Sequence, residues 1–282
     1  MAGMTCLGLG AGLISLFGFF VGPVAAEFSV GVATVNIAPV ALLLVPGVIA
    51  PLVGRLVDSW PIRKMLLAGS AFAMLSLFSI SFSASLWQAG LGFLGFAIGI
   101  TFYGPVVVNG LMVKIYSGRE GRALAVAALG ISVASVTLPP AIGVALQWLD
   151  WRQTLSVLSL SLLVVLWLWI LLGIPADAGA EVADTERSVD RGIYRRREFW
   201  LVGITVALTF NAMVILTICY PPLFSNRGFS AIQAGLFLAV AGMGGALGKL
   251  TVALLADQLR PYARFFVASL LLLKLLGIVM LF

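Results

Sequence analysis

The sequence predicts an all-α integral membrane protein built of transmembrane helices, and three observations support this class. Of the 282 residues, 61% are apolar and only 10% are charged, with a mean hydropathy of +1.13. Soluble domains contain about 25% charged residues, so the composition excludes water-soluble enzymes, disordered chains and nucleic-acid-binding proteins. The apolar residues form runs of about 20, the length that crosses a bilayer as a helix. Such runs are too long for the roughly ten-residue strands of a membrane barrel.

Nine apolar runs follow one another along the chain, and each is predicted to be one span. They cover residues 5–26, 34–56, 63–83, 87–110, 121–147, 153–173, 199–221, 231–256 and 262–282. Fourteen of the 17 basic residues follow the even-numbered runs or lie at their ends, whereas only Arg152 and Arg227 lie on the other side. Because cytoplasmic loops carry the excess of Lys and Arg, the N-terminus is expected in the cytoplasm and the protein in the cytoplasmic (inner or plasma) membrane.

Several kinds of chemistry lack their residues in this chain. There are two cysteines, Cys6 and Cys219, both in apolar runs, and no histidine. A disulfide framework, a zinc site of Cys/His type and a histidine base are therefore not expected. The chain has no phosphate-binding loop, no HExxH motif and no nucleophile–base constellation within the spans, so we expect neither an enzyme nor a resident metal or cofactor.

The spans are divided by one long polar segment and partly repeat after it. Residues 175–198 hold six acidic residues and five arginines without apolar periodicity, which predicts a cytoplasmic linker. Asp58 ends the second run and Asp257 ends the eighth, and the 199-residue offset between them is also kept by Ser70 and Ser269. Internal repeats of this kind are typical of transporters. We predict a six-helix bundle over residues 1–174 and the first three helices of a second bundle over 199–282, that is, six plus three of an expected twelve.

The loop between the second and third runs reads Gly54-Arg55-Leu56-Val57-Asp58-Ser59-Trp60-Pro61-Ile62-Arg63-Lys64. It resembles the signature loop of the major facilitator superfamily, and the resemblance covers essentially the whole chain. An ordinary hairpin with cytoplasmic basic residues is the alternative, but Asp257 and Arg260 repeat part of the pattern. The resemblance implies a gating role for Gly54, Arg55, Asp58, Arg63, Lys64, Asp257 and Arg260. Pro61 stands where the family usually has Gly.

A second motif narrows the resemblance to one branch of the superfamily. The run from Tyr116 to Ala125, Pro139-Pro140 and Trp151-Arg152 look like the monocarboxylate transporters and oxalate/formate exchangers. In that branch an arginine eight residues before the cytoplasmic Asp or Asn of helix 8 commonly holds the substrate carboxylate, and here that position is Lys249. Some members carry an acid one turn earlier, where this chain has Gly245.

Lys249 is also notable without any resemblance, because eight residues of helix place it about 12 Å above the end of its span. A cation at that depth faces a cavity or pairs with an anionic group; alternatively it snorkels to the interface or pairs within the protein. Further candidates for lining a cavity are Asn36, Tyr103, Asn109, Asn211 and Tyr220, although interhelical hydrogen bonds explain each equally well. Glu27, at the end of the first run, is expected to be solvated.

Glycines at four-residue spacing are predicted to allow close helix approach. They form the pairs Gly8 and Gly12, Gly18 and Gly22, Gly95 and Gly99, and Gly244 and Gly248.

These observations favour a secondary transporter of a small organic solute, in particular a carboxylate anion, working by alternating access with a co-transported proton or an exchanged anion. The expected partners are this solute and the lipid bilayer, with no nucleic acid. A drug or hydrophobic-solute exporter is one alternative. A truncated, transport-inactive membrane protein is another, since the second bundle is incomplete.

Overall fold

The computed structural model describes residues 2–116, 120–176 and 196–259, and of the last predicted span residues 265, 268, 269, 271–273, 275 and 276. The side chains of residues 120–122, 202, 206 and 252–259 lie outside this description. Within these ranges every bounded element is helical. The elements are α1 (Ala2–Glu27), α2 (Val32–Val35), α3 (Ala38–Ser59), α4 (Ile62–Ile80), α5 (Leu86–Tyr103), α6 (Pro105–Ile115), α7 (Glu120–Trp148), α8 (Trp151–Gly173), α9 (Arg197–Asn226) and α10 (Ala231–Leu259).

Eight helical segments of the described chain are long and apolar enough to cross a membrane, and they coincide with the first eight predicted spans. The ninth predicted span, 262–282, falls largely outside the described residues. Two spans consist of two helices each: the second of α2 and α3, and the fourth of α5 and α6. The fourth is interrupted between α5 and α6, where Gly104 adopts an extended conformation (φ −85°, ψ −155°) and Pro105 begins the next helix. Proline cannot donate to the helical ladder and disfavours a helical residue before it, which explains the break.

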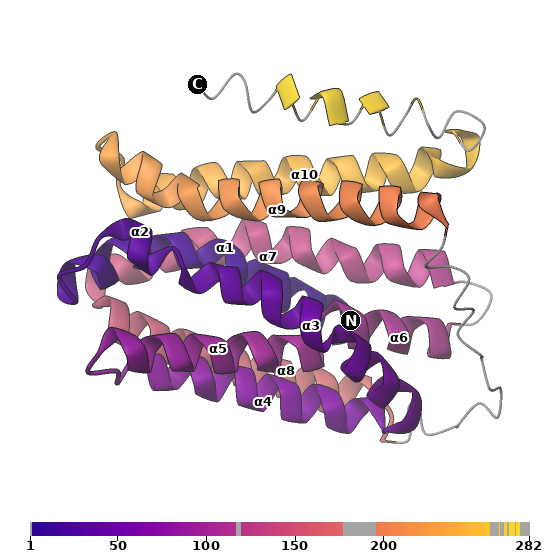
Figure 1. Cartoon of the computed structure of the whole chain (residues 1–282), viewed down its shortest axis with the longest axis horizontal. Helices are drawn as coiled ribbons and strands as arrows, with labels where there is room; N and C mark the ends of the chain where they lie inside the picture. The colour runs from indigo at the N-terminus through magenta and orange to yellow at the C-terminus, as the bar shows by residue number, and fades with distance from the viewer. Residues whose placement is uncertain are drawn as a thin grey trace.

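The long helices lie side by side in layers (Figure 1). α4, α5 and α8 pack together, α1 and α7 lie beside one another next to them, and α9 and α10 lie beyond α7 and α1. α1 is the central helix: 72% of its most apolar stretch is buried, against 12% in the span formed by α9. The core side chains around it include Leu16, Phe96 and Tyr103.

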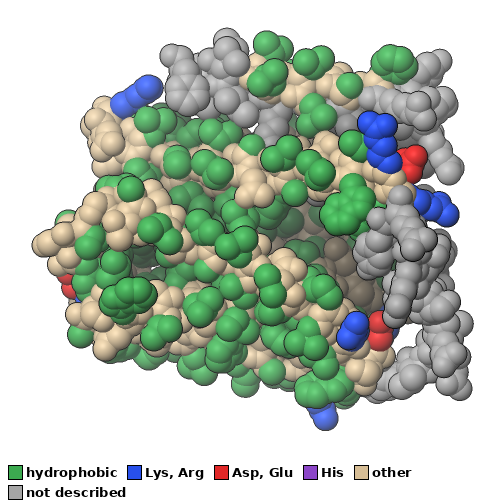
Figure 2. All heavy atoms as spheres, in the orientation of Figure 1, with side chains coloured by type: hydrophobic (Ala, Val, Ile, Leu, Met, Phe, Trp, Pro, Cys, Tyr) green, Lys and Arg blue, Asp and Glu red, His purple; other side chains and the backbone are tan. Residues whose placement is uncertain are grey.

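The helix connections gather at two ends of the molecule (Figure 1). The end that carries Arg63, Lys114 and Arg197 is called the basic end here, and the opposite end is called the Glu27 end. Figure 2 shows charged side chains at these two ends and apolar side chains over the helices between them. This distribution suits a bilayer, in which the middle of the molecule faces hydrocarbon.

Several predicted glycine contacts are confirmed. A Cβ added at Gly8 would lie 2.5 Å from the carbonyl oxygen of Gly130 on α7, and one at Gly99 would lie 2.5 Å from the backbone nitrogen of Ala73 on α4. A Cβ at Gly12, Gly18 or Gly95 would likewise lie within 3 Å of a neighbouring helix. For Gly22, Gly244 and Gly248 no atom of the described residues lies within 4 Å of an added Cβ, so close approach there stays a prediction. Spacing alone does not show which face of a helix is covered.

Candidate functional site

Lys249 lies at the contact between α10 and α7. Its Nζ donates a hydrogen bond to Ser132 Oγ at 2.9 Å and a longer one to the carbonyl oxygen of Ala128 at 3.4 Å, both on α7. Ser132 is 4% exposed, and Lys249 itself is partly buried. The ammonium group is therefore held at the surface of a neighbouring helix, 117 residues away in the chain.

Small residues allow this contact, because they let the backbones of α7 and α10 come close. A Cβ added at Gly235 would lie 2.6 Å from the Pro139 carbonyl oxygen, and one added at Gly242 would lie 2.9 Å from Ser135 Cβ. The pairs run in opposite directions along the two helices, so the helices are antiparallel. Lys249 makes the next contact between α10 and α7 toward the basic end, where its side chain reaches Ser132 and Ala128.

The surroundings of Lys249 contain no described carboxylate. Both acceptors are uncharged, and the only ion pair among the described residues joins Arg152 to Glu27 at the opposite end from the basic end. All eleven acidic residues of the sequence lie at span ends or in the linker, namely Glu27, Asp58, Glu120, Asp150, Asp177, Glu181, Asp184, Glu186, Asp190, Glu198 and Asp257. A cation within a span usually pairs with an anionic group. The arrangement can accept such a group from a solute.

The structure places the other five predicted solute-binding residues at separate positions, and none shares a hydrogen bond with Lys249. Tyr103 is fully buried at the end of α5, and Asn109 is exposed on α6. Asn36 lies at the break between α2 and α3, with its Oδ1 buried and without a hydrogen-bond partner among the described residues. Asn211 donates to the Ala207 carbonyl oxygen of its own helix at 2.9 Å, and Tyr220 stacks on Phe224 with ring centroids 6.0 Å apart. Their solute-binding role stays a prediction.

The predicted gating loop connects α3 to α4 at the basic end. Arg63 Nη2 donates to the Leu171 carbonyl oxygen in the last turn of α8 at 3.2 Å. Arg55, Asp58 and Lys64 are exposed, Gly54 is partly buried, and the Asp58 carboxylate makes no hydrogen bond or ion pair within the described part of the chain. Only the backbone of Asp257 is described, near the end of α10, and Arg260 lies outside the described residues. Gating by this loop therefore stays a prediction.

Lys114 fixes the end of α3 beside this loop. Its Nζ donates to the Val57 carbonyl oxygen at 2.7 Å. The last carbonyl groups of a helix lack partners within the helix, and a cation there also interacts favourably with the helix dipole.

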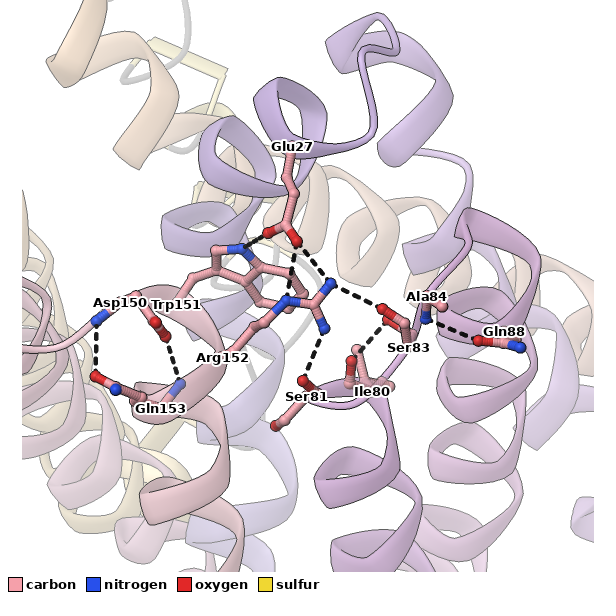
Figure 3. Close-up of polar contacts among 10 residues, drawn as sticks. All are labelled: Glu27, Ile80, Ser81, Ser83, Ala84, Gln88, Asp150, Trp151, Arg152 and Gln153. Atoms are coloured by element: carbon pink, nitrogen blue, oxygen red, sulfur yellow. Dashed lines mark hydrogen bonds and ion pairs between the residues drawn. The ribbon is translucent and has the colours of Figure 1, made fainter.

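A polar cluster at the Glu27 end was not predicted from the sequence (Figure 3). The Arg152 guanidinium donates to Glu27 Oε1 and to the carbonyl oxygens of Ser81 and Ser83, while Trp151 Nε1 donates to Glu27 Oε2. Glu27 is exposed, as expected, and it also accepts these hydrogen bonds because α8 begins beside the end of α1. Opposite charges at the same predicted end of two spans were the available signal.

A cavity of about 500 Å³ lies near the Glu27 end among α1, α3, α5 and α8. Its lining is almost wholly apolar, with Phe17, Phe20, Phe93 and Leu42 on its walls and one hydroxyl group, that of Thr34. None of the predicted solute-binding residues lines this cavity. It offers little to hold a small anion, so Lys249 remains the better candidate.

Eight membrane-length helical spans in the described part of the chain define a multi-pass helical membrane protein. The sequence matches the Major Facilitator Superfamily over residues 3–282, so the chain belongs to this family of membrane transport proteins, which are not enzymes.

Curated relatives support the same conclusion. The chain is 27% identical to human monocarboxylate transporter 11 over 257 residues, covering 89% of this chain and 54% of the relative. It is 25% identical to the mouse monocarboxylate transporter 11 over 256 residues, covering 89% and 57%. It is 26% identical to the nitrite extrusion protein of Bacillus subtilis (strain 168) over 223 residues, covering 74% and 52%. The chain thus spans about half the length of these relatives. The resemblance to the monocarboxylate-transporter branch is supported.

Proposed function

We propose that this protein is a secondary transporter that carries a small organic anion, in particular a monocarboxylate, through the membrane. The observation that carries the proposal is the Lys249 ammonium group, which lies in a membrane-spanning helix and, among the residues that the structure describes, has only uncharged acceptors. A bound anion would supply the missing counter-charge. A neutral solute would not.

The names of the relatives support this chemistry. They describe monocarboxylate transport and nitrite extrusion. A carboxylate and a nitrite ion each carry one negative charge shared by two oxygen atoms. A lysine ammonium is a compact point charge without the fixed fork of arginine. It therefore suits small monoanions of more than one shape.

The proposed mechanism is alternating access, in which residues 1–174 and 199–282 belong to two bundles that rock about a site between them. The loops containing Asp58 and Asp257 would alternately close and release the cytoplasmic side. A co-transported proton or an exchanged anion would make the movement of the anion electroneutral. The protein would lie in the cytoplasmic membrane, and the basic loops favour an N-terminus on the cytoplasmic side.

Reconstitution of the full chain into liposomes tests the proposal. Uptake of radiolabelled lactate is compared for wild type, Lys249→Met and Lys249→Arg, with Arg227→Ala as the control for an exposed cation elsewhere. We expect Lys249→Met to reduce lactate uptake at least tenfold, because removing a charged hydrogen-bond partner costs about 1.5–3 kcal/mol. Lys249→Arg should retain part of it.

Equal lactate uptake by wild type and Lys249→Met would contradict the anion proposal. Export of a hydrophobic dye that lactate does not inhibit would favour the drug-efflux alternative instead. A well-folded wild type that moves neither solute would favour the transport-inactive alternative.

A further inference from the structure

Resting on the proposed function, we propose that Ser132 is the second residue of the anion site, donating from its hydroxyl group to one oxygen of the anion while Lys249 binds the other. Nothing in the sequence pattern singles out Ser132. The assignment comes from its position opposite Lys249, with Nζ and Oγ 2.9 Å apart.

The hydrogen-bonding capacity of the two groups supports this pairing. An ammonium group has three N–H donors, and in Lys249 two of them point to Ser132 Oγ and the Ala128 carbonyl oxygen. One N–H remains. A serine hydroxyl that accepts a hydrogen bond keeps its own O–H as a donor. Two donors are thereby placed side by side, as an anion with two oxygen atoms requires.

The environment of Ser132 makes its hydroxyl group selective. The side chain is 4% exposed, so water has little access to it. A buried donor left without a partner costs free energy, and this favours a solute that presents a second oxygen over one that presents a single acceptor. Ser132 would therefore set the preference for two-oxygen anions, whereas Lys249 sets the preference for negative charge.

The two residues come from opposite sides of the predicted division of the chain. Ser132 belongs to α7 in the first predicted bundle, and Lys249 belongs to α10 in the second. An anion bound to both would join the two helices and stabilise the arrangement in which they lie close together. A ligand shifts a conformational equilibrium only through such a difference in affinity between states.

Two variants of nearly equal shape separate hydrogen bonding from packing. Both variants add a methyl group to Cβ. Ser132→Thr keeps the hydroxyl group beside it, whereas Ser132→Val has a second methyl group of similar size in place of the hydroxyl group. Both are reconstituted as full chains beside Lys249→Met, and lactate uptake is measured over a range of concentrations. Ser135→Ala is the matched control, because Ser135 lies one turn away on α7 and its hydroxyl donates to the Ile131 carbonyl oxygen of its own helix.

We expect Ser132→Val to raise the KM for lactate about tenfold relative to Ser132→Thr, with maximal rates within about twofold, as one hydrogen bond to a charged group predicts. Ser135→Ala should keep the wild-type KM. Equal KM values for the Thr and Val variants, or a lower maximal rate at unchanged KM, would overturn the role of Ser132. If both variants fail to fold, Ser132→Ala against Ser135→Ala decides on the same criteria.

The outcome for Lys249→Met separates the two proposals. Loss of uptake in Lys249→Met together with equal KM values for the Thr and Val variants would overturn only the role of Ser132. Unchanged uptake in Lys249→Met would overturn the anion site as a whole.

Discussion

Arg152 at the start of α8 binds Glu27 at the end of α1 through two hydrogen bonds to the same carboxylate oxygen, from Nε at 3.0 Å and from Nη2 at 2.7 Å. The same guanidinium donates to the Ser81 and Ser83 carbonyl oxygens at 2.7 and 2.8 Å, in the connection between α4 and α5. It also lies over the Trp151 ring, 4.6 Å from the centroid. One side chain thus joins three segments that are far apart in the sequence.

Removing this side chain should loosen the Glu27 end. We expect Arg152→Ala to lower the melting temperature of the detergent-purified protein, with a loss of about 1–2 kcal/mol, since the pair is partly exposed and screened by solvent. Arg227→Ala, an exposed cation at the same end, should leave it unchanged. In a double-mutant cycle, the stability lost in the variant carrying both Arg152→Ala and Glu27→Ala should be smaller than the sum of the losses in the two single variants. Additive losses would mean that Arg152 acts only through the serine carbonyl groups.

Two glycines on α5 should respond in opposite ways to alanine. A Cβ at Gly99 would lie 2.5–2.7 Å from backbone atoms of Ala73, whereas no atom in the described part of the chain lies within 4 Å of a Cβ at Gly90. Gly99→Ala should therefore push α4 and α5 apart and destabilise the protein by about 1–3 kcal/mol. Gly90→Ala should be neutral or slightly stabilising, because alanine favours helix. Melting curves of the two variants in the same detergent check this, and similar curves would contradict the close packing of α4 on α5.

The hydrogen bond from Lys114 to the Val57 carbonyl oxygen should stabilise the C-terminal end of α3. Lys114→Ala is expected to cost about 0.5–1 kcal/mol, because a free carbonyl group and the helix dipole lose their cation. Hydrogen exchange of the amides near the end of α3 should then be faster. Lys64→Ala is the control, since Lys64 is exposed at the start of α4. Equal exchange in both variants would show that the bond contributes nothing.

Composition and run length were sufficient to predict the membrane class and the positions of eight spans, because burial in lipid demands long apolar helices. The position of Lys249 within a span could also be predicted, since a cation deep in an apolar run is unusual in any sequence; its role in solute binding stays a prediction. Its partner Ser132 could not, because one serine among many is selected only by the packing of α7 on α10. The bonds between Glu27 and Arg152 depend in the same way on helices that meet 125 residues apart.

The orientation predicted from the basic residues can be measured with single cysteines placed just before and just after α4. Ser59 is the last residue of α3, at the basic end, and Ala84 lies in the connection between α4 and α5, at the Glu27 end; both are exposed. In a background that carries Cys6→Ala and Cys219→Ser, Ala84→Cys should react with a membrane-impermeant maleimide in intact cells. Ser59→Cys should react only after the cells are permeabilised, because loops rich in Lys and Arg stay in the cytoplasm. The reverse pattern would place the N-terminus and Asp58 outside, and the proposed cytoplasmic gate would then be on the wrong side of the membrane.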